Sequence, residues 1–157
     1  MNKPIYLTPA GKEKLKKEYE HLIGPKRQEL SARLRVAIQQ GDLKENAEYH
    51  AAREKQSFIE GRIKELEGLI SLAQVIDPKT LSGSVKFGAT VELVDEDTEE
   101  EKTFQIVGEA EANIEKGLLN INSPLARALT GKEEGDSVEV KTPGGSKDYE
   151  IVKISYI

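Results

Sequence analysis

The chain of 157 residues contains no cysteine and no tryptophan, and only 5% of its residues are aromatic. Without cysteine it cannot form a disulfide framework, a thiolate zinc site, an iron–sulfur cluster or a thiol nucleophile. The two histidines, His21 and His50, are far apart in the sequence and do not show the spacing of a histidine metal motif. These absences exclude thiol enzymes and the common histidine- and cysteine-based metal sites.

Long apolar runs are absent as well. The first residues, MNKPIY, lack the apolar run of a signal peptide, and no stretch approaches the ~20 apolar residues of a membrane span. We therefore expect a cytoplasmic protein with no membrane partner. Its hydrophobic fraction of 37% is low beside a charged fraction of 32%, which suits a charged helical rod and a modest core better than one large globule.

Charge is divided unevenly along the chain. The net charge of −5 argues, as an average, against a nucleic-acid binder held by phosphate contacts. Residues 1–77, however, carry 14 Lys and Arg against 12 Asp and Glu, whereas residues 78–157 carry 9 against 16. The first half also holds a basic group with only Glu29 nearby as an opposing charge: Lys26, Arg27, Arg33 and Arg35. The pattern alone favours a solvated helix face for these four residues.

The first half predicts two long helices. Thr8 followed by Pro9 is typical of a helix start, because Thr supplies a capping oxygen and Pro needs no hydrogen-bond partner there. The step between the apolar residues Leu22 and Leu30 is eight rather than seven, and Pro25 lies inside it. We therefore predict a kink or local break at the proline.

The second helix shows a heptad seam of mostly apolar residues, spaced alternately by four and three: Ala52, Gln56, Ile59, Ile63, Leu66, Ile70 and Ala73. Between the two patterns, Gly41 is suited to ending one helix and Asp42 to starting the next. Such a short connection predicts an antiparallel coiled-coil hairpin, each arm of which, at roughly 30 residues, reaches about 45 Å.

The helical spacing of apolar residues ends at Pro78, where the second half of the chain begins. Short runs rich in β-branched residues predict strands at 89–94, 103–107, 137–141 and 149–154. Ser123 and Pro124 repeat the capping pattern of a helix start, and Gly131 is a suitable helix end. The prediction is an α+β protein of two domains, with a helical hairpin at 1–77 and an antiparallel β-sheet domain with one short helix at 78–157.

The predicted hairpin tip, residues 41–48, contains three carboxylates, of which Asp42 and Glu45 are three residues apart. This spacing fits a capping box, in which each side chain bonds the backbone N–H of the other, and the spacing alone favours that interpretation. Alternatively, both carboxylates point past the end of the rod, where oxygen donors suit Mg²⁺. An exposed pair holds Mg²⁺ weakly, so a useful site needs further ligands from another molecule.

The tip sequence GDLKENAEYHAARE at 41–54 resembles the GreA/GreB family of bacterial transcript cleavage factors, and its GreA branch more closely than GreB. The resemblance continues in order along essentially the whole chain, through 60–63, 73–77, 87–91, 121–127 and 141–145. It implies an N-terminal coiled-coil hairpin and a C-terminal FKBP-like domain that docks at the rim of the secondary channel of RNA polymerase. The hairpin then enters the channel, and the protein is expected to act as a monomer.

The resemblance also implies site residues. Asp42 and Glu45 match the two acidic residues that help to hold a second Mg²⁺ beside the polymerase's own aspartates, where the 3′ end of backtracked nascent RNA is cleaved. Cleavage then depends on the polymerase, and no turnover by the factor alone is expected. Arg53 matches a position proposed to contact RNA or the polymerase, and Asn122, Ser123 and Pro124 match a segment proposed to contact the channel rim.

One position departs from the family pattern. Ile38 stands where many relatives have an arginine, and Arg35 lies almost one turn earlier. The basic patch that contacts the RNA end in the family is therefore expected to be smaller or displaced, with Arg35 and Arg53 as its candidates.

Two alternatives remain open. A regulator of the channel that does not promote cleavage is one, although its relatives carry different tip acids. An FKBP-like peptide-binding module is the other. It is weakened because an aromatic proline pocket requires more than the scattered aromatics of the second half: Phe87, Phe104, Tyr149 and Tyr156. A fold shared with isomerases does not establish their activity.

Overall fold

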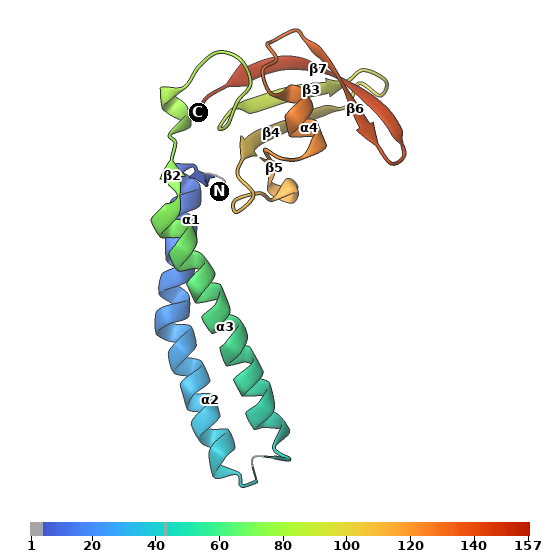
Figure 1. Ribbon diagram of the computed structural model, residues 1–157. Helices are drawn as coiled ribbons and strands as arrows, with labels where there is room; N and C mark the ends of the chain where they lie inside the picture. The colour runs from blue at the N-terminus through green and yellow to red at the C-terminus, as the bar shows by residue number, and fades with distance from the viewer. Residues whose placement is uncertain (1–4, 43) are drawn as a thin grey trace. The chain divides into compact units, whose positions relative to one another are not determined.

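The protein, here as a computed structural model that describes residues 5–42 and 44–157, divides into two units (Figure 1). Lys12–Leu72 form a helical hairpin, and the chain up to Gly11 joins Ala73–Ile157 in a β-sheet unit. The predicted α+β class, with an N-terminal hairpin and a C-terminal sheet domain, is confirmed. Within the described residues, no helix is long and apolar enough to cross a membrane.

The first arm of the hairpin is α1 (Pro9–His21), a π-helical turn (Leu22–Lys26) and α2 (Arg27–Gln39). Its start is as predicted: the Gly11 backbone N–H donates to the Thr8 hydroxyl oxygen at 3.1 Å, which caps the helix. The second arm is a single helix, α3 (Ala47–Leu72).

The π-helical turn explains the eight-residue step between Leu22 and Leu30. Pro25 lies inside this turn, and a proline has no N–H to donate to the preceding turn of a helix. A π-helical turn accommodates one additional residue, so the apolar face continues on the same side after it. Leu30 is buried against Ile59 and Ile63 of α3, with Leu22 packed beside them. The predicted local break is thus a change of helical type without loss of the helix.

The two arms pack along the predicted seam, of which Ala52, Ile59, Ile63 and Leu66 of α3 are buried. Ion pairs flank it. The Arg62 guanidinium donates to both carboxylate oxygens of Glu18, at 2.8 and 3.0 Å, and this hydrogen bonding lowers the pKa of Glu18. Because exposed ion pairs contribute only ~0–1 kcal/mol, we attribute the stability of the hairpin mainly to the apolar seam.

Two members of the basic group have carboxylate partners, one of which the sequence pattern did not indicate. Arg27 donates two hydrogen bonds of 2.8 Å to Glu60 across the hairpin, and Lys26 lies 3.5 Å from Glu29. The expectation that only Glu29 opposes the group was therefore wrong, because α3 brings Glu60 to the same surface.

The β-sheet unit contains a five-stranded sheet in the order β5-β4-β3-β7-β6. Its strands are β3 (Thr90–Asp95), β4 (Glu101–Val107), β5 (Leu118–Asn120), β6 (Ser137–Thr142) and β7 (Gly145–Ser155). All neighbours pair antiparallel except β4 and β5, which are parallel. Four strands match the predicted runs, whereas β5, with three residues, is too short to show an alternating pattern.

Residues from this sheet and from α4 (Pro124–Leu129) form the second core. Ile106, Ile151 and Leu129 are completely buried in it. The helix begins as predicted, since the Ala126 backbone N–H donates to the Ser123 hydroxyl oxygen at 3.3 Å. A further short pair, β1 (Tyr6–Leu7) and β2 (Gln74–Val75), lies where the chain leaves and re-enters this unit.

We predict that Ile63→Ala lowers the free energy of unfolding of the hairpin by ~2–5 kcal/mol, because it opens a cavity in the seam. Ile63 is 2% exposed, whereas Phe58 on the same helix is 77% exposed. Phe58→Ala is therefore the matched control, with an expected change within ~0.5 kcal/mol. Denaturant unfolding followed by the helical circular dichroism signal tests this, and equal losses would contradict the assignment of the seam.

Candidate functional site

The connection between α2 and α3 forms the tip of the hairpin. Helix α2 ends as the backbone N–H of Gln40 donates to the Ala37 carbonyl at 3.2 Å. Gly41 follows with φ +114°, a conformation that glycine adopts without steric cost. The predicted glycine stop therefore lies where expected. Leu43 lies outside the described residues.

Asn46 closes the tip. Its side-chain oxygen accepts a hydrogen bond from the Tyr49 backbone N–H at 3.0 Å, which is the geometry of an N-cap for α3. Its side-chain nitrogen donates to the Ala37 carbonyl at 2.6 Å. One side chain thus caps the start of α3 and gives the Ala37 carbonyl, near the end of α2, a second donor besides the Gln40 backbone N–H. The sequence offered a signal for it, since Asn is a preferred N-cap and Glu48 follows in the first turn.

Asp42 does not start the second helix, contrary to the expectation from the sequence. Its carboxylate accepts a hydrogen bond from the Lys44 backbone N–H at 3.0 Å, which forms a local turn. A capping box requires the Glu45 N–H to donate to Asp42, and no such bond is present among the described residues. The capping box that the spacing favoured is therefore not formed, because Asn46 occupies the capping position four residues later.

Asp42 and Glu45 are both exposed in the four-residue stretch between Gly41 and Asn46. Neither carboxylate is buried in the fold, and both retain oxygen atoms that a cation can use. Carboxylate oxygens are the ligands that Mg²⁺ prefers, so the donor chemistry of this pair fits that ion. Two carboxylates fill only part of an octahedral shell, and water or another molecule must supply the remaining ligands.

The described residues contain no group of three or more His, Asp or Glu that could hold a metal ion.

The basic candidates lie on both helices behind the tip. Arg53 on α3 is exposed and donates from Nη1 to the Gln56 side-chain oxygen at 3.2 Å. Arg35 on α2 is exposed and forms no ion pair within the described part of the chain. Ile38, where an arginine was expected from the family pattern, is 51% exposed.

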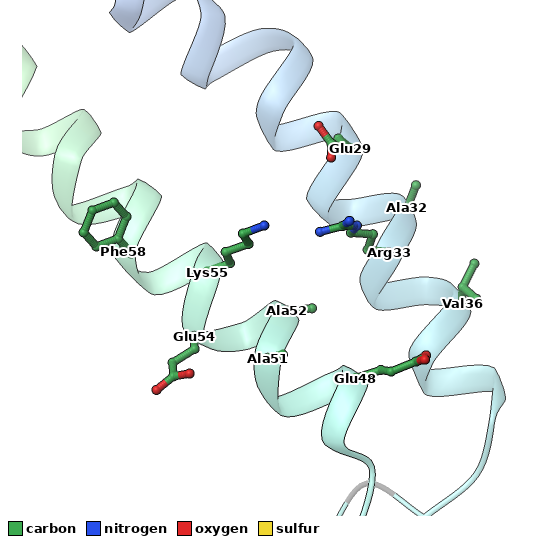
Figure 2. Close-up of a pocket in the computed structure, with 10 residues that line it drawn as sticks. All are labelled: Glu29, Ala32, Arg33, Val36, Glu48, Ala51, Ala52, Glu54, Lys55 and Phe58. Atoms are coloured by element: carbon green, nitrogen blue, oxygen red, sulfur yellow. The ribbon is translucent and has the colours of Figure 1, made fainter.

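A groove of about 1040 Å³ lies between α2 and α3 near the tip (Figure 2). Figure 2 shows the side chains of Arg33 and Lys55 directed toward one another from the two helices. Small and apolar residues form much of its lining: Ala32, Val36, Ala51, Ala52 and Phe58. Sequence reasoning did not find this groove, because small seam residues do not reveal how closely two helices pack.

The segment matched to channel-rim docking belongs to the β-sheet unit. Asn122 and Pro124 are exposed, whereas Ser123 is half-buried and caps α4. The Asn122 backbone N–H donates to the Asn120 side-chain oxygen at 2.9 Å, which shapes the turn before the helix. The predicted site residues therefore fall into two groups, one on the hairpin and one on the sheet unit.

Comparison with known proteins gives matches along nearly the whole chain. A family model described as "Transcription elongation factor, N-terminal" matches residues 5–75, and one described as "Transcription elongation factor, GreA/GreB, C-term" matches residues 79–156. Transcription elongation factor GreA of Jannaschia sp. (strain CCS1) is 70% identical over 153 residues, which are 98% of either chain. The GreA of Ruegeria pomeroyi is 67% identical over 152 residues, which are 97% of either chain.

Among solved structures, GreA factor homolog 1 of Thermus thermophilus is 29% identical, with a TM-score of 0.45. The match covers 97% of this chain and 99% of that one.

We predict that Asn46→Ala lowers the stability of the hairpin by ~0.5–2 kcal/mol, the usual effect of losing an N-cap, because it removes the bond to the Tyr49 N–H and the bond that ties the loop to the Ala37 carbonyl. Glu45→Ala at the exposed neighbouring position should change stability by no more than ~0.5 kcal/mol. Thermal unfolding of the two variants measures both effects. A larger loss from Glu45→Ala would restore the capping box as the role of the acidic pair.

Proposed function

The chain belongs to the GreA/GreB family of transcription elongation factors, and from this premise we propose that it stimulates cleavage of backtracked nascent RNA by bacterial RNA polymerase. The hairpin enters the secondary channel, the 3′ segment of the RNA is removed, and arrested elongation resumes. The observation that carries this proposal is the exposed pair Asp42 and Glu45 at the tip, which the fold does not use as a helix cap.

Asp42 and Glu45 are proposed to hold Mg²⁺ jointly with carboxylates of the polymerase. The bound ion would position and activate a water molecule for attack on an RNA phosphodiester. The chain's own contribution is placement: Gly41 turns the backbone at the end of α2, and Asn46 fixes the start of α3. The two acids between them are thereby presented on a closed, capped loop.

The length of the hairpin supports delivery of these acids to a remote site. Helix α3 has 26 residues and is therefore about 39 Å long at 1.5 Å per residue. The apolar seam is covered by the opposite arm, and most of the residues on the outer faces are polar or charged. A long, capped hairpin can carry two carboxylates into a channel of a larger enzyme.

The remaining site residues take supporting roles in this proposal. Arg35 and Arg53 are exposed on the two helices behind the tip and contact the RNA end or the polymerase. The segment Asn122, Ser123 and Pro124 docks on the channel rim, with Asn122 and Pro124 exposed for contact. Because Ile38 replaces a basic residue near the tip, the RNA contact is small. The factor acts as a monomer and does not cleave RNA alone.

We predict that Asp42→Ala or Glu45→Ala lowers RNA cleavage in a stalled, backtracked complex by at least about tenfold. The loss of a group that only hydrogen-bonds a metal ligand already lowers activity by about that factor, and a lost ligand should cost at least as much. Binding to the polymerase should be nearly unchanged, since these side chains lie at the tip and not on the docking surface. Glu20→Ala is the matched control: it removes an exposed carboxylate from α1, far from the tip in sequence. Cleavage and polymerase binding are measured side by side.

Wild-type cleavage by the Asp42→Ala/Glu45→Ala double variant would contradict metal donation. A wild-type chain that binds the polymerase without stimulating cleavage would instead identify a regulator of the channel. RNA incubated with the chain and Mg²⁺ in the absence of polymerase should remain intact, and its cleavage would make the chain a nuclease in its own right.

A further inference from the structure

The segment after β4 reaches the start of helix α1 through Glu111. The Thr8 backbone N–H donates to Oε2 of Glu111 at 3.2 Å, and the Thr8 hydroxyl donates to Oε1. The same hydroxyl oxygen accepts the Gly11 backbone N–H, so one side chain links the helix cap to a residue 103 positions away in the sequence. Thr8 is only 3% exposed, which removes these bonds from competition with water.

Gly11 provides the space that the carboxylate occupies. A Cβ placed on Gly11 would lie 2.3 Å from Cδ of Glu111, which is far inside van der Waals contact. A glycine in the first turn of a helix is otherwise unfavourable relative to alanine. A carboxylate is also favourable there, because the free N–H groups give the helix start a partial positive charge. The glycine and the acid are therefore matched to each other.

Neighbouring backbone contacts hold the same short segment. A Cβ on Gly108 would lie 2.7 Å from the Tyr6 carbonyl oxygen, so the loop after β4 approaches the chain closely just before α1. On its other side, the Gln74 and Ile76 backbone N–H groups donate to the Ile5 and Leu7 carbonyls, both at 2.8 Å. The residues that lead into α1 are thus held within the sheet unit from two directions.

We propose that Glu111 is a positioning residue that restricts the swing of the hairpin relative to the β-sheet unit. Helix α1 starts within the sheet unit and continues into the hairpin, with the division between the units falling after Gly11. A helix transmits the direction of its first turn along its length, so holding Thr8 and Gly11 limits the directions the hairpin can take. This bond set, which we call the Glu111 clasp, comprises Thr8, Gly11 and Glu111.

The consequence for activity rests on the proposed function. If the sheet unit docks on the polymerase rim, a restricted hairpin loses less conformational freedom when its tip enters the channel. The Glu111 clasp therefore lowers the concentration of factor needed for half-maximal cleavage. It does not change the maximal cleavage rate, which depends on the tip carboxylates.

A double-substitution cycle tests the clasp in the free protein. In the wild type, Gly11→Ala should lower the Tm, because the new Cβ displaces the Glu111 carboxylate, which is the movable end of a side chain. In a Glu111→Ala background the collision is absent, and Gly11→Ala should raise the Tm, because alanine favours a helix more than glycine. The same sign in both backgrounds would overturn the pairing of Gly11 with Glu111.

Spin-label distances test the restriction itself. The chain has no cysteine, so Lys64→Cys and Lys132→Cys place one label on each unit without background labelling. Glu111→Ala should broaden the distance distribution between the two labels, whereas Glu109→Ala, at an exposed neighbouring position, should leave it unchanged. Thr8→Ser should keep the wild-type width, because it retains the hydroxyl. An unchanged width in the Glu111→Ala protein would overturn the proposal.

Cleavage of backtracked RNA separates positioning from chemistry. Glu111→Ala should raise the half-saturating concentration of the factor and leave the maximal cleavage rate unchanged. A broadened distance distribution with a wild-type half-saturating concentration would overturn the role of the clasp in the reaction. If the wild-type chain stimulates no cleavage, the proposed function fails, while the spin-label and Tm measurements still decide the clasp.

Discussion

The apolar seam between the two arms of the hairpin is the interaction on which the site depends. A two-helix hairpin buries one stripe on each arm, so its tip stays in place only while both stripes face each other. Pro25 interrupts the regular α-helix in the first arm. The π-helical turn around it accommodates one additional residue, so the apolar stripe continues on the same side. The alignment of Leu30 with Ile59 and Ile63 follows from that single local adjustment.

At the tip of the hairpin, hydrogen bonds from a polar side chain, and not apolar packing, hold the two arms together. Asn46 bonds both the start of α3 and the last turn of α2, so the loop is closed without using the acidic residues beside it. This division of labour has a chemical consequence. A carboxylate committed to backbone N–H groups has fewer free lone pairs, whereas Asp42 accepts one local bond and Glu45 lies exposed. The hydrogen bonds that close the tip therefore come from Asn46, and the oxygen atoms of the two acids stay largely available.

At the start of α1 the reverse holds, because the fold there uses an acidic side chain. There an acid, Glu111, is committed to the fold, where it bonds Thr8 at the start of α1. The acidic residues in the second half of the chain therefore do not all have the same role. Some carboxylates, such as Glu111 and Asp95, accept hydrogen bonds from the backbone, and such bonds lower the pKa of Asp95. A net charge taken over a whole chain does not distinguish these uses.

Much of the fold followed from the sequence because its signals are local. The caps at Thr8 and Ser123, the heptad seam of α3 and four of the five sheet strands depend on residues a few positions apart, and the structure has them where expected. The parallel strand β5 was missed, because three residues carry no period.

The sequence by itself determined the hairpin, the sheet and the position of the acidic tip, since periodicity and capping act within single elements. Only the tertiary structure decided the use of individual side chains. It paired Arg27 with Glu60 and brought Glu111 to Thr8. The physical reason is that a hydrogen bond depends on a few tenths of an ångström between groups far apart in the chain, and no spacing in the sequence encodes that distance.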